Sequence, residues 1–311
     1  MLYLKSGQQV QAAGHWTKTL SGCSNNVREL TAVHKALQSF VKLLPSNSSL
    51  RINSDNTTTV AYLNKFGGRF ANLDNEARIL FALAARHNWT LSAHHVPGIL
   101  NVIPDQLSRR LDRSDWKLHP TLFQLAEHLW GHHTIDRFAT AVNKQTRRFN
   151  SAMLQPGSEA VDALTQSWAH DNNWINPPWR LIPQVLSKLR RDRAVATLVV
   201  PVWPSQSWWP TLLQLVDLSA PPPIALPRVQ GVFIPSLPTV DLLPEPWKCP
   251  NWRVALIRVS GRRPANSPAT ISSLQSWLDT PMLGLTALTV LPSSSSSWNE
   301  TLARCRRLLS C

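Results

Sequence analysis

Cysteine is scarce in this sequence, with only four among 311 residues. The four stand at Cys23, Cys249, Cys305 and Cys311. No two of them form a CxxC pair, and such wide spacing favours free thiols in a reducing compartment over a disulfide framework or a zinc site. No secretory signal opens the sequence, so its Asn-x-Ser/Thr sequons are expected to carry no glycan. These absences predict an intracellular protein, cytoplasmic or nuclear.

Long apolar runs and acidic residues are also lacking. No stretch reaches the roughly 20 apolar residues that a membrane-spanning helix requires, so we expect no membrane partner. Aspartate and glutamate number 18 against 32 lysines and arginines, which gives a net charge of +14. A positive charge of this size favours nucleic acid as the partner. Charge scattered over the surface for solubility alone is the alternative interpretation.

Apolar residues, in contrast, are plentiful: they make up 43% of the chain and include 14 tryptophans. This composition supplies buried cores and excludes wholesale disorder. The length predicts two domains. We expect an α/β domain over residues 1–115 and a second α/β domain over 116–220. Proline and serine crowd residues 221–311, which predicts a partly disordered extension.

The periodicity of apolar residues predicts alternating strands and helices. In the first unit, strands are expected over 9–16, 50–54 and 90–96, and helices over 29–44, 57–66 and 73–88. In the second unit, a helix ending at Trp130 precedes a short strand that ends at Asp136. The apolar run over 194–202 then predicts a fully buried strand.

Three carboxylates in the first unit occupy positions that suit metal binding. Asp55 follows a predicted strand, while Glu29 and Asp105 fall in the first turns of predicted helices. Strand ends and helix starts can meet at one crevice of an α/β sheet, where carboxylates hold two Mg²⁺ ions roughly 4 Å apart. The alternative is ordinary, because the N-terminus of any helix favours acidic side chains.

Neighbouring residues favour the metal-binding interpretation. In order along the chain stand GHW at 14–16, RELTAV at 28–33, SDNTTTVAYLN at 54–64, HVPG at 95–98 and DQLSR at 105–109. This series resembles the ribonuclease H domain of retroelement polyproteins, most closely those of DIRS-type retrotransposons. The resemblance implies that Glu29, Asp55 and Asp105 are the second, third and fourth metal-binding carboxylates. It also implies that the substrate is the RNA strand of an RNA/DNA hybrid.

The beginning of the chain departs from that family. Its members carry their first catalytic aspartate on an opening strand, and this sequence begins at about the end of that strand. We therefore expect a ribonuclease H-like mixed sheet that lacks its first strand and first carboxylate, with impaired cleavage. A reverse transcriptase domain is expected upstream in an intact element.

Two pairs of histidines are further candidates. His94 and His95 end a predicted strand, where a packed or hydrogen-bonded role is the first interpretation and an accessory catalytic role for His95 the second. His132 and His133 have no third ligand at a useful spacing, so we do not expect zinc there.

The second unit contains the segment NPPW, formed by Asn176, Pro177, Pro178 and Trp179 after an apolar stretch. Prolines fix the direction of the backbone. An asparagine carbonyl beside a proline carbonyl offers two acceptors to an exocyclic amine, and an aromatic ring can stack on a flipped base. A structural turn without function is the alternative, since the chain contains 24 prolines.

Motifs around NPPW point to adenine methylation. They are DRFAT at 136–140, Asn143, RF at 148–149, DAL at 162–164, Trp168, VVPVW at 199–203 and WWP at 208–210. Their order resembles the methyltransferase-like domain that follows ribonuclease H in DIRS-type elements, itself similar to phage adenine-N6 methylases. The resemblance implies that Asn176 and Trp179 face the target base and that Asp136 lies near S-adenosylmethionine. No glycine-rich FxGxG-type loop follows Asp136, however.

Three functions therefore stay open: hybrid cleavage by a Mg²⁺-dependent ribonuclease H, methylation of adenine, and binding of nucleic acid by a catalytically dead remnant. Each implies a nucleic-acid partner, either an RNA/DNA hybrid or DNA. The expected fold is an α/β chain in which the ribonuclease H-like unit precedes the methyltransferase-like unit.

Overall fold

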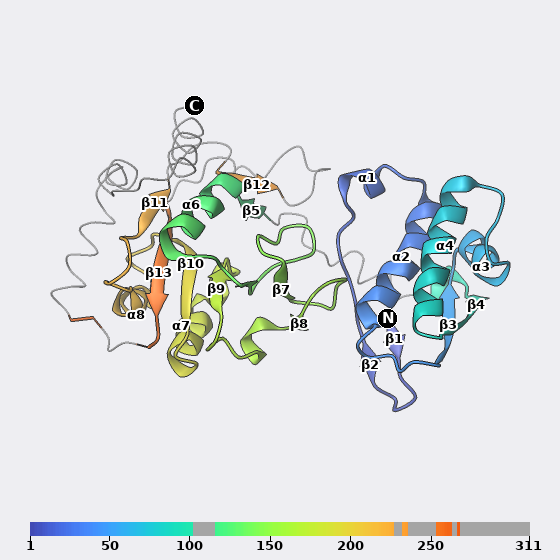
Figure 1. The fold of residues 1–311 in the computed structure, drawn as a ribbon, viewed down its shortest axis with the longest axis horizontal. Coiled ribbons are helices and arrows are strands. Elements are labelled where there is room, and N and C mark those ends of the chain that lie inside the picture. Colours follow the sequence, from blue (N-terminus) through green and yellow to red (C-terminus); the bar gives the residue numbers. More distant parts are fainter. Residues whose placement is uncertain (102–115, 227–231, 236–252, 263–265, 268–311) are drawn as a thin grey trace. The chain divides into compact units, whose positions relative to one another are not determined.

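A computed structural model describes residues 1–101, 116–226, 232–235, 253–262 and 266–267. The chain is mixed α/β and divides into two compact units, the first built mainly from residues 1–101 and the second from residues 116 onward (Figure 1). Asp105 lies outside the described residues. Within them, no helix is long and apolar enough to cross a membrane.

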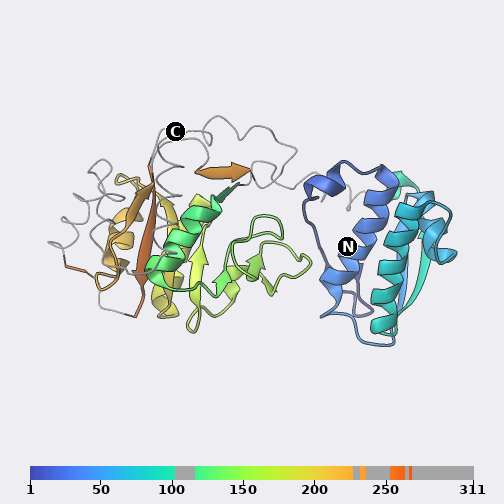
Figure 2. The same cartoon turned by 45° about the horizontal axis from the view of Figure 1, so that its top comes forward.

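Unit 1 combines a hairpin, a parallel pair of strands and helices. Its strands are β1 (Leu2–Tyr3), β2 (Gln9–Val10), β3 (Ser49–Ser54) and β4 (Thr90–His95). Its helices are α1 (Lys18–Ser21), α2 (Asn25–Phe40), α3 (Thr57–Asn64), α4 (Ala71–Arg86) and the 3₁₀ turn η1 (Gly98–Leu100). β1 pairs with β2 in antiparallel fashion, and β3 pairs with β4 in parallel. Helices α2 and α4 pack side by side (Figures 1 and 2).

The core of unit 1 follows the apolar spacing of its helices. Leu30 and Leu37 on α2 meet Ala77 and Leu80 on α4, and all four side chains are buried. Helix α2 begins earlier than expected, because the N–H of Arg28 already donates to the carbonyl oxygen of Ser24. The expectation that the helix opens at residue 29 was wrong in this respect.

The start of unit 1 also differs from expectation. Of the strand predicted over residues 9–16, only Gln9–Val10 forms a ladder, and Ala12 makes a single bridge. Extended residues form a strand only where a neighbouring strand accepts their hydrogen bonds, and periodicity does not reveal that neighbour.

Unit 2 is built on a seven-stranded mixed sheet in the order β11-β13-β10-β9-β6-β7-β8. The strands are β6 (Ile135–Asp136), β7 (Arg148–Ser151), β8 (Ala160–Val161), β9 (Asn172–Ile175), β10 (Val195–Pro201), β11 (Ile224–Leu226) and β13 (Val254–Ser260). The pairs β7–β6, β6–β9 and β9–β10 are parallel, whereas β13 runs antiparallel to both β10 and β11. A separate antiparallel pair joins β5 (Trp116–Leu118) to β12 (Phe233–Pro235).

Helices cover both faces of this sheet. They are α6 (Pro120–Trp130), α7 (Ile182–Arg191), α8 (Trp209–Leu215) and the 3₁₀ turns η2 (Ala163–Thr165) and η3 (Trp179–Leu181). Leu198 and Val200 on β10 point toward the core that contains α7 and α8, while Val199 between them points toward α6. Strand β10 confirms the buried strand predicted over 194–202, because a strand with helices on both faces is apolar on both.

The sheet extends past the domain boundary expected at residue 220. Strands β11 and β13 of this sheet lie beyond it, as does β12 of the separate pair, and β13 is a buried strand between β11 and β10. This strand was missed because its seven residues stand between proline-rich and serine-rich segments, and the composition of the whole region is typical of irregular structure.

Candidate functional site

Unit 1 brings two of the three predicted carboxylates together. Strand β3 ends at Ser54, and Asp55 follows it directly. The next residue, Asn56, caps α3 by accepting from the N–H of Thr59, and its amide nitrogen donates to Oδ1 of Asn26 over 2.9 Å. This bond ties the end of β3 to the first turn of α2. Glu29 lies three residues after Asn26 and therefore on the same face of the helix.

The electrostatics of Glu29 reflect this closeness. Burial raises the pKa of the Glu29 carboxyl, the charge of Asp55 raises it further, and Arg28 opposes both effects. The two carboxylates therefore lie close enough to repel each other, and a divalent cation would relieve that repulsion.

The segment after β4 passes beside Asp55. A Cβ atom built on Gly98 would lie 3.4 Å from Oδ2 of Asp55, so the backbone approaches this carboxylate closely. His95 stands opposite Ser54 in the parallel register. His94 and His95 are both exposed, so neither is packed in the core, and the hydrogen-bonded alternative stays a prediction.

Asp105, the third predicted carboxylate, lies outside the described residues, and its place beside Glu29 and Asp55 stays a prediction. Among the residues that the structure does describe, no group of three or more histidine, cysteine, aspartate or glutamate side chains is placed to hold a metal. The candidate site therefore consists of Glu29 and Asp55, with the segment from Gly98 onward leading toward Asp105.

In unit 2, NPPW lies directly after β9 and leads into η3. Strand β6 is the parallel neighbour of β9 and ends at Asp136, which is paired with Trp174. From β6 the chain continues to β7 on one side, and from β9 to β10 on the other. Asp136 and Asn176 thus mark the carboxyl ends of two strands at a topological switch point, where α/β sheets bind their ligands.

Asn176 and Trp179 differ in their surroundings. The Oδ1 atom of Asn176 is buried and has no hydrogen-bond partner among the described residues. The ring of Trp179 packs edge to face on Trp203, with 4.9 Å between centroids, and contacts both cores. Pro177 is buried beside them and Pro178 is exposed. Asn176 therefore offers an acceptor to a ligand, while much of Trp179 is committed to packing.

Asp136 has a structural partner. Its buried carboxylate accepts the backbone N–H of Gln145 through Oδ2 over 3.0 Å, which fixes the loop that leads to β7.

The next residue, Arg137, is also buried, and its guanidinium is fully engaged. It donates to Oδ1 of Asn173 (2.7 Å), to Oδ1 of Asn150 (2.9 Å), to the carbonyl oxygen of Ser167 (2.9 Å) and to Oδ2 of Asp171 (2.8 Å). Phe138 then packs on Trp168. Large side chains thus occupy the end of β6, where a glycine-rich loop would let a cofactor approach the backbone, so these residues do not fit S-adenosylmethionine in that manner.

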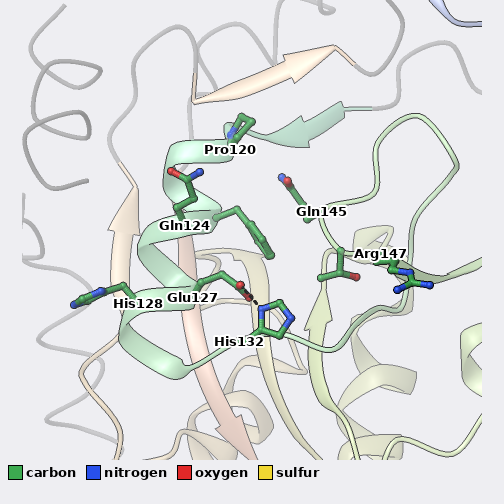
Figure 3. A pocket seen from close by; sticks show the side chains of 9 residues that line it. Pro120, Gln124, Glu127, His128, His132, Gln145 and Arg147 are labelled. Carbon is green, nitrogen blue, oxygen red and sulfur yellow. Dashed lines mark hydrogen bonds and ion pairs between the residues drawn. The ribbon is translucent and has the colours of Figure 1, made fainter. Parts of the chain in front are cut away.

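A pocket of about 650 Å³ opens elsewhere in unit 2, along α6 (Figure 3). Its lining includes Gln124, Glu127, His128, His132, Gln145 and Arg147. Neither Asp136 nor any NPPW residue lines it, so this pocket is not the site that the methyltransferase resemblance implies for those residues.

Glu127 organises the two histidines that follow α6. Its carboxylate lies 2.7 Å from Nδ1 of His132 and 2.7 Å from Nδ1 of His133, and Nε2 of His133 lies 2.8 Å from the hydroxyl of Thr197. Burial lowers the pKa of His133 to about 4, although Glu127 opposes this shift, so the buried ring is neutral at pH 7. Burial raises the pKa of Glu127, but hydrogen bonds from His133 and His132 outweigh it and the pKa ends below its usual value.

This cluster was not predicted from the sequence. His132 and His133 were considered only as metal ligands and lacked a third ligand, whereas in the structure the carboxylate of Glu127 orients both rings. The signal was present in the sequence, since Glu127 stands only five and six residues earlier, at the end of a predicted helix. No protein-family model matches the chain, and no curated protein is significantly similar to it.

Proposed function

We propose that unit 1 is a ribonuclease H-like nuclease domain that binds Mg²⁺ through Glu29, Asp55 and Asp105 and acts on the RNA strand of an RNA/DNA hybrid. The observation that carries this proposal is the approach of Glu29 to Asp55 through the bond between Asn26 and Asn56. Two carboxylates 26 positions apart in the sequence thus lie close together, as metal binding requires.

The donor set supports Mg²⁺ as the cofactor. Mg²⁺ is a hard cation that prefers carboxylate oxygens, and two bound ions stabilise the attacking and leaving oxygens of a phosphodiester. In this chain, Glu29 and Asp55 would hold the cation. A Cβ atom at Gly98 would contact the carboxylate of Asp55, so the glycine keeps this side of it open. His95, which is exposed at the end of β4, is proposed to have an accessory role in proton transfer.

Metal binding and cleavage test this proposal separately. Calorimetric titration of the 311-residue chain with Mg²⁺ should show binding that Asp55→Asn removes, whereas Asp74→Asn on α4 should leave it unchanged. Cleavage of a labelled hybrid should be slow, because the chain matches three of the family's four carboxylates. Mg²⁺ binding that survives Asp55→Asn would contradict the assignment.

We further propose that unit 2 has a methyltransferase-like fold. Its order of strands supports this second candidate: five strands ordered β8-β7-β6-β9-β10 are followed by an antiparallel β13 and then by β11. The switch point between β6 and β9 in this order is where α/β sheets bind their ligands. NPPW at the switch point, with its buried acceptor on Asn176, fits the binding of a base edge.

The end of β6 favours a retained fold over an active methyltransferase. Arg137 and Phe138 fill the place of a glycine-rich loop, so unit 2 is proposed to contact nucleic acid without transferring a methyl group. Calorimetry with S-adenosylmethionine at millimolar concentration should give no heat. Measurable binding, or transfer of label from the cofactor to an adenine-containing duplex, would establish the active enzyme instead.

A further inference from the structure

Two aromatic rings lie exposed on a short turn of unit 1. The α3–α4 turn, residues 65–70, reads Lys-Phe-Gly-Gly-Arg-Phe and contains no acidic residue. The exposed fractions of Phe66 and Phe70 are 75% and 51%. Single apolar residues are common on protein surfaces, but two phenylalanines flanked by two cations within six residues form a surface of defined chemistry.

The turn is held in this shape by hydrogen bonds. The N–H of Gly67 donates to the carbonyl oxygen of Tyr62, the N–H of Gly68 to Oδ1 of Asp74, and the N–H of Phe70 to the hydroxyl of Tyr62. Phe66 adopts a φ of 59°, which an aromatic residue rarely does. A positive φ at a large side chain costs conformational energy, so the surrounding bonds maintain the exposed ring against that cost.

The rings of Phe66 and Phe70 are each supported by a neighbour and still expose surface that a partner can contact. Phe66 contacts the ring of Phe81 with centroids 5.0 Å apart, which supports it from one side. The guanidinium of Arg69 lies over the ring of Phe70 at 4.7 Å. A guanidinium stacked on an aromatic ring extends the flat surface on which a further planar group can stack.

The local charge is positive. Asp74 is the nearest acidic residue along the chain. Its carboxylate accepts hydrogen bonds from the N–H of Gly68 and from Nε of Arg78, so its charge is already paired with a cation. These two bonds hold the pKa of Asp74 below its usual value. Lys65 and Arg69 are both exposed, and together with Arg78 they outnumber the one carboxylate of Asp74, so the net charge of this surface is positive and favours a polyanion over another apolar surface.

We propose that the α3–α4 turn binds single-stranded nucleic acid by stacking unpaired bases on Phe66 and Phe70, while Lys65 and Arg69 contact its phosphates. Unpaired bases expose both faces to stacking, whereas a duplex covers them. The inference rests on the proposed function only in that unit 1 handles nucleic acid; the binding uses neither Glu29 nor Asp55.

Fluorescence anisotropy with labelled single strands tests the proposal in the presence of a chelator, so that no cleavage occurs. The probes are oligo(dT) and oligo(U) of about 12 nucleotides, within the range that one such surface contacts, and a duplex of equal length. We expect the single strands to bind more tightly than the duplex. Each of Phe66→Ala and Phe70→Ala should weaken that binding roughly tenfold.

Matched variants separate stacking from a change in fold. Phe66→Trp keeps a stacking ring and should retain binding. Leu43→Ala removes an apolar side chain that is 41% exposed on another segment and should have no effect. The double variant Lys65→Ala/Arg69→Ala should lower the slope of log K against log salt by about 1.4, since each phosphate contact on a single strand contributes about 0.7.

Unchanged single-strand binding by Phe66→Ala/Phe70→Ala, at an unchanged Tm, would overturn the proposal. So would equal losses for the duplex, or a change in oligomeric state without a change in binding, which would identify a second copy as the partner. Asp55→Asn distinguishes this proposal from the nuclease: it should abolish Mg²⁺ binding and leave single-strand binding intact.

Discussion

Replacing Arg137 with methionine tests whether the end of β6 is structural. Arg137→Met keeps most of the apolar stem and removes four hydrogen bonds from a side chain that is 2% exposed. Breaking a buried ion pair costs about 3–5 kcal/mol. We expect the lower end of this range, because the carboxylate of Asp171 keeps its contact with Arg148 at 2.7 Å.

The matched control is Arg148→Met, which removes the other cation from the same carboxylate. The Arg148 side chain is 44% exposed, so solvent screens its ion pair. We expect this variant to lose less than about 1 kcal/mol.

Thermal unfolding followed by circular dichroism measures the difference. A loss of about 3 kcal/mol lowers the Tm of a unit of this size by roughly 6–12 °C, and the control should fall by about 2–4 °C at most. Equal Tm values for Arg137→Met and the unmodified chain would refute the reasoning. Gain of S-adenosylmethionine binding at unchanged stability would show that Arg137 blocks a cofactor site instead of supporting the sheet.

Three further predictions concern both units. Unit 2 should lose about 3 kcal/mol of stability as the pH falls from 6.5 to about 4, because burial lowers the pKa of His133 and the unfolded chain therefore binds the proton first. Urea unfolding across this pH range measures the loss, and His133→Gln should remove it. Asp55→Asn should lower the pKa of Glu29 toward its usual value without fully restoring it, since burial remains, and NMR titration of the carboxyl carbon would detect the change. Gly67→Ala should destabilise unit 1 by at least about 1 kcal/mol in urea, because its φ is positive and the new Cβ would meet Oδ1 of Asp74.

Local patterns predicted most of the regular elements. The spacing of apolar residues placed α2 and α4 within a few residues of their observed bounds, and an uninterrupted apolar run placed β10. The position of Asp55 at the end of β3 also followed from the sequence, because a strand that ends before a helix cap is a local pattern. These features depend on residues that are near one another in the chain.

Features that depend on distant partners were missed. The pairing of β13 with β10 joins segments about sixty residues apart, and a proline-rich segment separates them. The engagement of Arg137 depends on Asn150, Asn173 and Asp171, none of which stands beside it in the sequence. Side chains that meet across a sheet leave no periodic pattern in the sequence. The structural role of Arg137, which stands within a motif that resembles a functional site, could therefore not be predicted.

The place of β13 between β10 and β11 has a consequence for synthesis of the chain on the ribosome. Strand β10 is complete at Pro201 and pairs with β9 along one edge, but β13, its partner on the other edge, ends only at Ser260, so the nascent chain must hold an apolar strand with one edge unpaired while this segment is made. Pairings between such distant segments form slowly, and open strand edges recruit other chains. A fragment that stops before Val254 is therefore expected to aggregate during expression, whereas one that includes Ser260 can complete the ladder.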